Sequence, residues 1–362
     1  MRICYLADTA SVHTTKWVRY FLERGHNVHV ITASAGEGAF DDRTHVLRLP
    51  VVVRGVRPFL APPQIRRIVK RIAPQVLHAH NVSGYGFWGA RTGFHPFVLT
   101  AWGSDVLVTA SASRAATWMA KYALERADLI TCDAHHIRRP LIALGARPEK
   151  VQIVNFGVDT RKFSPVAPGT SRATPPPFVI ISLRSFYPVY DVGTLIRAFA
   201  LVVQHVPDSR VVLIGDGEER GQLEQLARDL GVGDRVLFGG RVPNDSLPVR
   251  LHSAQVYVST SLSDAGIAAS TAEAMACGLP VVITDFGDNG RWVKNGEGGF
   301  LFRPGDHEAL AQAIVWLLTH EGARSAFGRV NRTTIEQHND YEKEMAKMER
   351  LYEELCVQPN AT

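Results

Sequence analysis

The sequence has few cysteines and lacks a long hydrophobic run. Its four cysteines are scattered over 362 residues without a CxxC pair, which excludes a disulfide scaffold or a zinc ribbon and is typical of the reducing cytosol. No window reaches the ~18 uncharged apolar residues of a membrane-spanning helix. Residues 1–8 lack the apolar core of a signal peptide. We therefore expect a cytoplasmic protein, either soluble or peripheral on the inner face of the membrane.

Two phosphate-binding motifs are missing: a glycine-rich turn after the first predicted strand, and a P-loop anywhere in the sequence. The turn after the first predicted strand, residues 8–16, reads DTASVHTTK rather than GxGxxG, and no GxxxxGK[ST] P-loop occurs. This disfavours a dehydrogenase and a P-loop kinase or ATPase. With 46% hydrophobic and 21% charged residues, the composition also disfavours disordered and fibrous classes, and the length predicts about two globular domains.

Charge is distributed unevenly along the chain. Residues 1–175 carry 23 Lys and Arg against 11 Asp and Glu, net +12, whereas the remainder carries 17 and 24, net −7. A basic half suits anionic lipid, nucleic acid or phosphorylated substrates, but no nucleic-acid-binding module accompanies it, so we expect no nucleic-acid partner. Its densest stretch, residues 54–72, mixes arginines with Ile and Val. That mixture suits a membrane interface, or alternatively an amphipathic helix whose apolar face packs on a sheet.

Strands and helices alternate in both halves of the chain, which predicts an α/β fold of two Rossmann-like domains. Residues 164–177, SPVAPGTSRATPPP, interrupt the alternation and predict the hinge. We place the first domain at 1–165 and the second at 175–337, with a last helix within 338–362 that packs back on the first domain. Ligands of such sheets bind at the carboxyl ends of the strands, so we expect a site between the domains. The predicted strands are 3–7, 28–32, 76–80, 97–101 and 129–132, then 178–182, 210–215, 236–238, 256–259 and 281–284.

The most informative segment is residues 261–280, SLSDAGIAASTAEAMACGLP. Its small residues let backbone amides approach a ligand, and a helix starting near Ser270 offers its N-terminus to a diphosphate. Glu273, in the first turn, could accept hydrogen bonds from two ribose hydroxyls. Alternatively, Ser270 and Glu273 form a capping box. Arg184, at the end of a predicted strand, is a phosphate ligand or a partner in a surface salt bridge.

Ordered blocks of the chain resemble the family 4 retaining glycosyltransferases, which have the GT-B fold of two facing Rossmann-like domains with an interdomain cleft. In the second half these blocks are NFGVDTRKFSP (155–165), SLRSFYPVYDVGTLIRAFA (182–200), VVLIGDGEERGQLEQLA (211–227), VLFGGRVPNDSL (236–247) and EAMACGLPVV (273–282). The first half matches more weakly, through HTTKW, GHNVHVIT, VLHAHNVSGYG and LTAWGSDVL.

The resemblance implies a nucleotide-diphosphate sugar on the second domain and a hydroxyl acceptor on the first. It assigns the diphosphate to Arg184, the base to the residues around Arg241 and the ribose to Glu273. It further implies retention by same-face displacement without a protein nucleophile, and neither cofactor nor metal. The donor-binding candidates are Arg184, Tyr190, Gly215, Gly239, Arg241, Val242, Gly266, Ile267, Ala268, Ser270 and Glu273.

Three positions depart from the family pattern. The first of the two family glutamates falls at Ala265, so the adjacent Asp264 is a candidate to serve the sugar. The lysine that partners the arginine aligns with Tyr190, which offers a hydroxyl in place of a charge. The histidine of the first-domain T-x-H-G sequence is Trp102. These departures predict a subgroup with different sugar contacts, or a chain that binds without transferring.

The acceptor-side candidates lie in the first half. His78 and His80 share one strand face, which could suggest a metal, but no third ligand has suitable spacing; His80 is better placed to line the cleft, and His78 to pack in the core. Asp105 could act as a base or orient an acceptor hydroxyl, or could cap the next helix. The catalytic candidates are Asp264, Glu273 and Asp105, and the acceptor-side candidates are Ser11, His13, His80, Asn81 and Trp102.

These observations predict a retaining glycosyltransferase of the hexosyltransferase type. The basic first half suits a lipid-linked or anionic glycan acceptor, which favours cell-envelope or exopolysaccharide assembly at an anionic membrane surface. Two alternatives remain on the same architecture: a nucleotide-sugar 2-epimerase, which would convert the donor without an acceptor, and a non-catalytic nucleotide-sugar-binding or partner protein.

Overall fold

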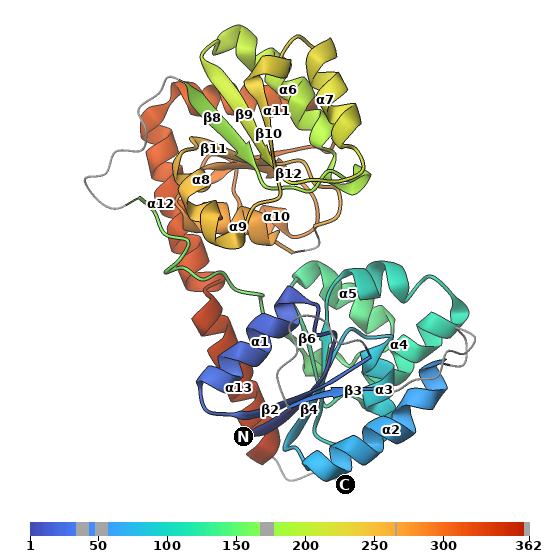
Figure 1. Ribbon diagram of the computed structural model, residues 1–362. Helices are drawn as coiled ribbons and strands as arrows, with labels where there is room; N and C mark the ends of the chain where they lie inside the picture. The colour runs from blue at the N-terminus through green and yellow to red at the C-terminus, as the bar shows by residue number, and fades with distance from the viewer. Residues whose placement is uncertain (34–42, 48–56, 167–176, 265, 358–362) are drawn as a thin grey trace. The chain divides into compact units, whose positions relative to one another are not determined.

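The computed structural model describes residues 1–33, 43–47, 57–166, 177–264 and 266–357. They form two compact units, Met1–Phe156 with Lys343–Thr362, and Gly157–Glu342 (Figure 1). The chain leaves the first unit at Phe156 and re-enters it at Lys343, so residues 157–165, which the sequence assigned to the first domain, lie in the second unit. Part of the predicted hinge, residues 167–176, lies outside the described residues.

The first unit is built on a seven-stranded sheet of order β3-β2-β1-β4-β5-β6-β7, in which every described pair is parallel. Its central strands are buried along nearly their whole length, as expected of apolar strands covered on both faces. The strands are β1 (Arg2–Leu6), β2 (Asn27–Thr32), β3 (Thr44–Val46), β4 (Val76–His80), β5 (Phe97–Ala101), β6 (Leu129–Cys132) and β7 (Val151–Ile153).

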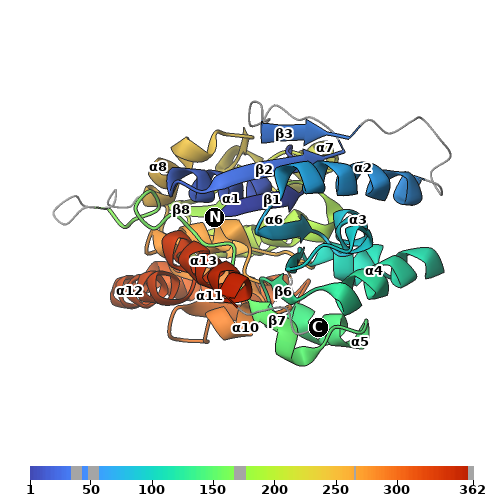
Figure 2. The ribbon, with the colours of Figure 1, turned by 90° about the horizontal axis from the view of Figure 1, so that it is seen from below.

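Helices cover both faces of this sheet. Figure 2 shows α2, α3 and α4 side by side along one face. On the other face, the ring of Phe21 in α1 lies 6.4 Å from Tyr5 of β1. The helices are α1 (Val12–Glu23), α2 (Arg57–Ile72), α3 (Tyr85–Thr92), α4 (Arg114–Arg126) and α5 (His135–Ala143), with a π-helical turn η2 (Asp105–Thr109) and a 3-10 turn η3 (Pro148–Lys150).

Helix α2 decides between the two interpretations of the basic, apolar stretch. Four of its apolar side chains, Ile65, Ile68, Val69 and Ile72, are less than 10% exposed, whereas Leu60 in the first turn is 39% exposed. Its basic side chains at positions 66, 67, 70 and 71 are exposed. Between Ile65 and Ile72 the apolar face is therefore used for packing, as the amphipathic-helix alternative predicted, and the basic face of this segment is what remains exposed. Arg54 lies outside the described residues.

The last helix, α13 (Tyr341–Val357), belongs largely to the first unit. Tyr352 is fully buried, and its hydroxyl lies 2.5 Å from His78 Nδ1 on β4 and 3.0 Å from the Tyr5 hydroxyl on β1. Glu349, one turn earlier, forms an ion pair with Arg24 at 2.8 Å. These contacts fix α13 against the sheet through polar groups that the interior must satisfy.

The second unit has a six-stranded sheet of order β10-β9-β8-β11-β12-β13, again parallel in every described pair. Its strands are β8 (Phe178–Ser182), β9 (Ser209–Ile214), β10 (Val236–Gly240), β11 (Val256–Ser259), β12 (Val281–Thr284) and β13 (Gly299–Phe302). Its helices are α6 (Val192–His205), α7 (Arg220–Asp229), α8 (Leu247–His252), α9 (Ala269–Ala276), α10 (Asn289–Trp292), α11 (His307–Thr319) and α12 (Glu321–His338), with 3-10 turns η4 (Pro188–Tyr190), η5 (Gly233–Arg235) and η6 (Asn244–Ser246).

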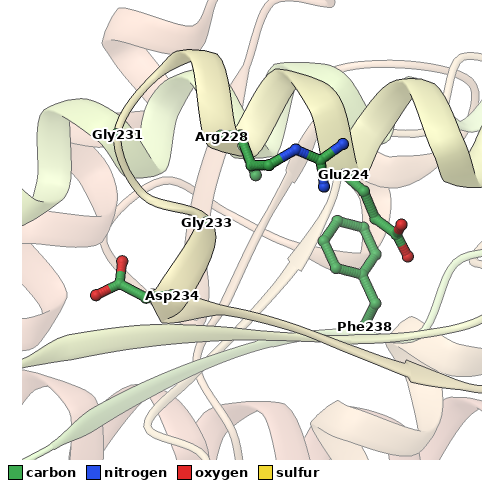
Figure 3. A pocket seen from close by; sticks show the side chains of 7 residues that line it. Glu224, Arg228, Gly231, Gly233, Asp234 and Phe238 are labelled. Atoms are coloured by element: carbon green, nitrogen blue, oxygen red, sulfur yellow. The ribbon is translucent and has the colours of Figure 1, made fainter.

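A surface hollow of about 590 Å³ lies under α7 (Figure 3). It is lined by Glu224 and Arg228 of α7, by Asp234 and by Phe238 of β10. The guanidinium of Arg228 already contacts the Gln225 amide oxygen at 2.7 Å. Asp234 precedes β10, so the hollow lies toward the amino end of that strand, whereas open parallel sheets bind ligands at the carboxyl ends.

Candidate functional site

The strand order of the second unit reverses between β8 and β11, and the two strands run out side by side into the loops that carry the predicted residues. Arg184 follows β8, and residues 260–264 follow β11. Helix α9 begins at Ala269. Open α/β sheets bind ligands at such a reversal, outside the carboxyl ends of the strands.

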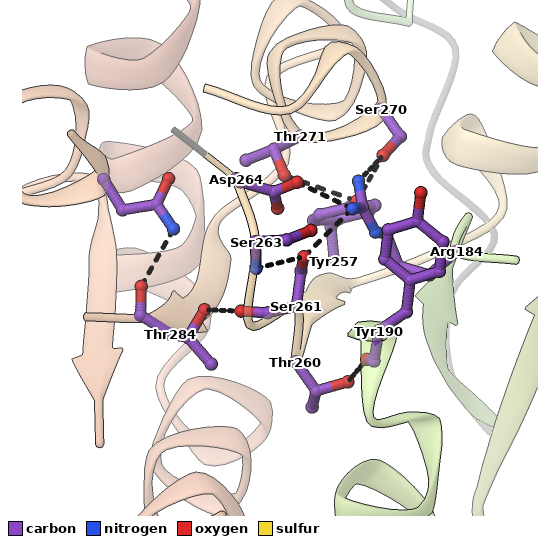
Figure 4. Close-up of polar contacts among 11 residues, drawn as sticks. Arg184, Tyr190, Tyr257, Thr260, Ser261, Ser263, Asp264, Ser270, Thr271 and Thr284 are labelled. Atoms are coloured by element: carbon purple, nitrogen blue, oxygen red, sulfur yellow. Dashed lines mark hydrogen bonds and ion pairs between the residues drawn. The ribbon is translucent and has the colours of Figure 1, made fainter. Parts of the chain in front are cut away.

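A buried guanidinium lies at the centre of this site. Arg184 is 9% exposed, and its Nη2 contacts Asp264 Oδ1 at 2.7 Å and Ser261 Oγ at 3.1 Å. Its Nη1 lies 3.4 Å from Ser270 Oγ. The Tyr190 ring centroid is 4.4 Å from the Arg184 Cζ, so the ring supports the cation through a cation–π contact. Figure 4 shows these side chains converging on Arg184.

The groups around Arg184 are themselves held in place. The Tyr257 hydroxyl lies 2.9 Å from Ser270 Oγ, and burial raises the pKa of Tyr257, so this hydroxyl keeps its proton at neutral pH. Thr284 donates to the Ser261 carbonyl at 2.6 Å, and Thr260 donates to the Tyr190 carbonyl at 2.8 Å. These hydrogen bonds hold the groups that contact the Arg184 guanidinium, and so they fix its position.

Glu273 lies in the second turn of α9, not in the first as predicted. The capping-box alternative is wrong, because the N-cap is Ala268 and the Ser270 side chain is directed to Arg184 and Tyr257. Glu273 is buried, and its Oε1 accepts from Asn244 Nδ2 at 3.3 Å. Asn244 in turn receives a hydrogen bond from the Lys162 ammonium.

The remaining donor-side candidates fall around the same edge of the sheet. A Cβ on Gly215 would lie 2.2 Å from the Arg184 carbonyl oxygen, and one on Gly239 would lie 2.6 Å from Ile214 Cδ1, so both glycines permit close packing. Arg241 is exposed and Val242 half-buried in the loop that leads to Asn244. Gly266 is buried and Ile267 half-buried at the start of α9. Ala265 lies outside the described residues.

In the first unit, aromatic rings and imidazoles gather at the carboxyl ends of β4 and β5. The rings of Trp102 and Phe156 stack with centroids 5.1 Å apart, and His13 lies 4.9 Å from Trp102 and 4.5 Å from Phe156. His80 lies 4.9 Å from Trp102 and contacts the Thr14 hydroxyl at 3.2 Å. Its buried Nε2 has no hydrogen-bond partner among the described residues.

Burial keeps these imidazoles uncharged. It lowers the pKa of His80 to about 3, with a smaller contribution from His13. It lowers the pKa of His13 to about 4, with a smaller contribution from the charge of Lys16. His78 is fully buried, as its core interpretation predicted, and bonds to Tyr352 and Thr100. Within the described ranges, no cluster of three His, Cys, Asp or Glu residues could hold a metal ion.

Asp105 accepts hydrogen bonds from the backbone amides of two loops. Its Oδ2 accepts from the Val82 amide at 2.7 Å and its Oδ1 from the Trp102 amide at 2.8 Å. Burial raises its pKa, against the opposing effect of these backbone hydrogen bonds. Asp105 thus ties the loop after β4 to the loop after β5. Asn81 turns the chain in the first loop with φ +64°, and Ser11 is the N-cap residue of α1.

A GxGxxG pattern lies at residues 84–89, between the end of β4 and the first turns of α3. Its glycines serve packing. A Cβ on Gly86 would lie 2.5 Å from the Asn81 carbonyl oxygen, and one on Gly89 would lie 2.5 Å from the Phe97 ring. The amides of Val82 and Gly84 are already bonded to Asp105 and Asn81. The pattern therefore brings α3 close to the sheet rather than presenting a free set of amides.

Both halves of the chain match known family models. Residues 2–134 match the model described as glycosyl transferase 4-like, and residues 169–334 match the model described as glycosyl transferases group 1. The chain belongs to the family 4 glycosyltransferases. Two alternatives at the sequence level, a 2-epimerase and a non-catalytic partner protein, are less well supported than glycosyl transfer, since the curated relatives are named as glycosyltransferases and synthases.

This glycosyltransferase is 24% identical to N-acetyl-alpha-D-glucosaminyl L-malate synthase of Bacillus anthracis, over 96% of its own length and 95% of the relative. It is 27% identical to the GDP-mannose-dependent alpha-(1-6)-phosphatidylinositol monomannoside mannosyltransferase of Mycolicibacterium smegmatis, over 59% of its own length and 60% of the relative.

Solved structures show that the fold is of the GT-B type. HepE of Anabaena in complex with UDP has a TM-score of 0.83 at 20% identity, with 98% of this chain and 100% of that chain covered. Sucrose-phosphate synthase of Thermosynechococcus elongatus has a TM-score of 0.79 at 20% identity, with 98% of this chain and 99% of that chain covered.

Among the described residues, none of the helices combines the length and the hydrophobicity that a membrane-spanning helix needs.

Proposed function

We propose that this glycosyltransferase moves a hexose-type sugar from a nucleotide-diphosphate sugar to a hydroxyl acceptor with retention of configuration. The observation that carries the proposal is the buried Arg184 guanidinium, fixed at the reversal point of the second sheet beside the start of α9. A buried cation next to a helix N-terminus suits a diphosphate. HepE, which shares the fold, has been solved with UDP-glucose, which agrees with this donor class.

The proposed chemistry requires stabilisation of a departing nucleoside diphosphate. As the bond between the anomeric carbon and the diphosphate oxygen breaks, negative charge grows on that oxygen, and Arg184 and the α9 amides are placed to stabilise it. The acceptor oxygen forms its new bond on the same face, and its proton passes to the departing phosphate. Glu273 would accept the ribose hydroxyls. The proposal needs neither a cofactor nor a metal ion.

The donor assignment is tested by thermal unfolding with a panel of UDP-, GDP- and ADP-sugars. A donor at 100 times its Kd should stabilise the wild type by about 2.7 kcal/mol. The Glu273→Ala variant should lose most of this stabilisation, because the ribose hydroxyls lose their acceptor. The control is Glu336→Ala, which removes a carboxylate on α12 that pairs with Arg332 and should respond to the donor as the wild type does. A folded wild type that no donor stabilises would refute the proposal, and donor consumption without an acceptor would indicate an epimerase instead.

The proposed setting is cell-envelope or exopolysaccharide assembly with a lipid-linked or anionic acceptor, at an anionic membrane surface. The net charge of +12 on residues 1–175 supports it, as does the relative named for a phosphatidylinositol monomannoside. Because the apolar face of α2 is buried between Ile65 and Ile72, the association would be electrostatic. Each exposed basic residue near such a surface contributes about 1 kcal/mol.

Vesicle flotation tests this setting. Wild-type protein should float with vesicles rich in anionic lipid at low salt and should be released as salt rises, because screening weakens the attraction. Reversing three exposed charges of α2, through Arg67→Glu, Lys70→Glu and Arg71→Glu, should abolish flotation.

The matched control reverses three exposed basic residues of the second unit, Arg291→Glu, Lys294→Glu and Arg303→Glu, and should still float. If the wild type fails to bind anionic vesicles at low salt, the membrane setting loses its main support. Equal loss of flotation in both triple variants would show that binding depends only on the net charge of the protein. It would contradict the proposal that α2 forms the membrane-binding surface.

A further inference from the structure

We propose that Asp264 competes with the donor for Arg184, so that a diphosphate binds only by displacing this carboxylate. The inference rests on the proposed function and adds a specificity-determining residue to it. In the free protein, Arg184 Nη2 and Asp264 Oδ1 form an ion pair at 2.7 Å, with side chains only 10% and 12% exposed. The group that would neutralise the diphosphate is thus already neutralised (Figure 4).

The Arg184–Asp264 ion pair is of a kind that a better anion can replace. Its recorded contact is a single Nη2–Oδ1 pair, and Arg184 Nε is buried without an acceptor among the described residues. Bidentate contacts between arginine and oxyanions are the strong ones. A diphosphate brings several oxygens and more charge than one carboxylate, and it can also accept from the amides at the start of α9.

Arg184 does not depend on Asp264 for its position. The Tyr190 ring, 4.4 Å from the Cζ, and the Ser261 hydroxyl, 3.1 Å from Nη2, both contact the guanidinium independently of the carboxylate. Ser261 is fixed in turn through its carbonyl by Thr284. Asp264 itself lies in the loop between β11 and α9, outside any regular element. Displacement therefore requires movement of the carboxylate while the cation stays in place.

Burial makes this an exchange of one anion for another. Leaving a buried guanidinium without a counter-ion is costly, so Asp264 should leave only when an incoming anion replaces it. A neutral sugar offers no charge, and a monophosphate offers fewer oxygens than a diphosphate. The pair therefore favours diphosphates over monophosphates, and after transfer the carboxylate is available to replace the departing nucleoside diphosphate.

The inference is tested by calorimetric titration of the full chain with inorganic pyrophosphate, a probe without ribose or base. Asp264→Asn removes the competing charge and should lower the Kd for pyrophosphate about tenfold, which corresponds to about 1.4 kcal/mol. The gain in affinity for orthophosphate should be larger, so that the preference for the diphosphate narrows. Asp264→Ser is a second neutral variant, in case the asparagine variant fails to fold.

The matched control is Glu336→Gln, which removes a carboxylate from another ion pair with an arginine in the same unit, at 2.7 Å from Arg332 Nε. It raises the net charge by the same amount and should leave the Kd for pyrophosphate within twofold of the wild type. A comparable gain in the control would assign the effect to net charge rather than to the freed Arg184, and would overturn the inference.

Failure of this inference can be told apart from failure of the proposed function. If neither pyrophosphate nor any nucleoside diphosphate binds the folded wild type or the folded neutral variants, the proposed function fails and the inference fails with it. If the wild type binds a nucleoside diphosphate, but folded Asp264→Asn and Asp264→Ser bind pyrophosphate no more tightly, only the inference is wrong.

Discussion

Replacing Arg184 with glutamine should lower kcat for sugar transfer by about a hundredfold to a thousandfold, the range observed when one group that stabilises developing negative charge is removed. Glutamine retains hydrogen-bonding capacity but no charge. The loss should be largest in kcat, because the charge on the departing oxygen grows as the bond breaks. Steady-state rates with the donor found in the thermal panel measure it.

The matched control for this variant is Arg332→Gln. Arg332 is another largely buried arginine of the second unit, bonded to the carbonyls of Phe163, Ala276 and Thr160. Its replacement should lower stability but leave kcat per folded molecule nearly unchanged. If Arg184→Gln transfers sugar within tenfold of the wild type, Arg184 is not the main stabiliser of the leaving group.

Truncating Tyr352 to alanine should cost the first unit about 3–5 kcal/mol of its free energy of unfolding. The side chain is fully buried between α13 and the sheet, and its removal leaves a cavity as large as an aromatic ring. Tyr352→Phe retains the ring and removes the hydrogen bond to His78, so it should cost about 1–3 kcal/mol. Urea unfolding followed by tryptophan fluorescence measures both, since Trp17 and Trp102 lie in that unit.

The control for Tyr352 is Glu353→Ala, an exposed change on the same helix, which should alter stability by no more than about 0.5 kcal/mol. Because the protein has two units, the unfolding curve can contain two transitions. We expect the transition of the first unit to move and that of the second to stay. Equal destabilisation by Tyr352→Ala and Glu353→Ala would show that α13 adds little to the first unit.

The sequence predicted the parts of the fold that leave a local periodic pattern. Both parallel sheets follow from buried apolar strands alternating with helices. The short strands β3 and β7 and the final strand β13 were missed, because runs of three or four residues carry too little pattern for such a prediction. The helix predicted near Ser270 begins at Ala269, but its capping box does not form, since Ser270 is recruited by a tertiary contact to Arg184.

The sequence predicted which residues belong to the candidate site, but not which of them contact one another. The position at a strand end identified Arg184, and the comparison with the family pattern identified Asp264 and Tyr190. The ion pair between Arg184 and Asp264 joins loops 80 residues apart, and only the strand order that places β8 beside β11 brings those loops together. Asp105 shows the same limit, because its amide partners, Val82 and Trp102, come from two different loops.

The path of the chain sets an order of assembly during synthesis. The first unit is begun first, yet it lacks Tyr352 and the rest of its share of α13 until residues 157–342 have left the ribosome. The second unit is continuous and can complete its sheet as soon as it emerges, since domains generally fold as units during translation. The first unit is therefore the last to be completed. The surface that α13 later covers stays exposed while the second unit folds.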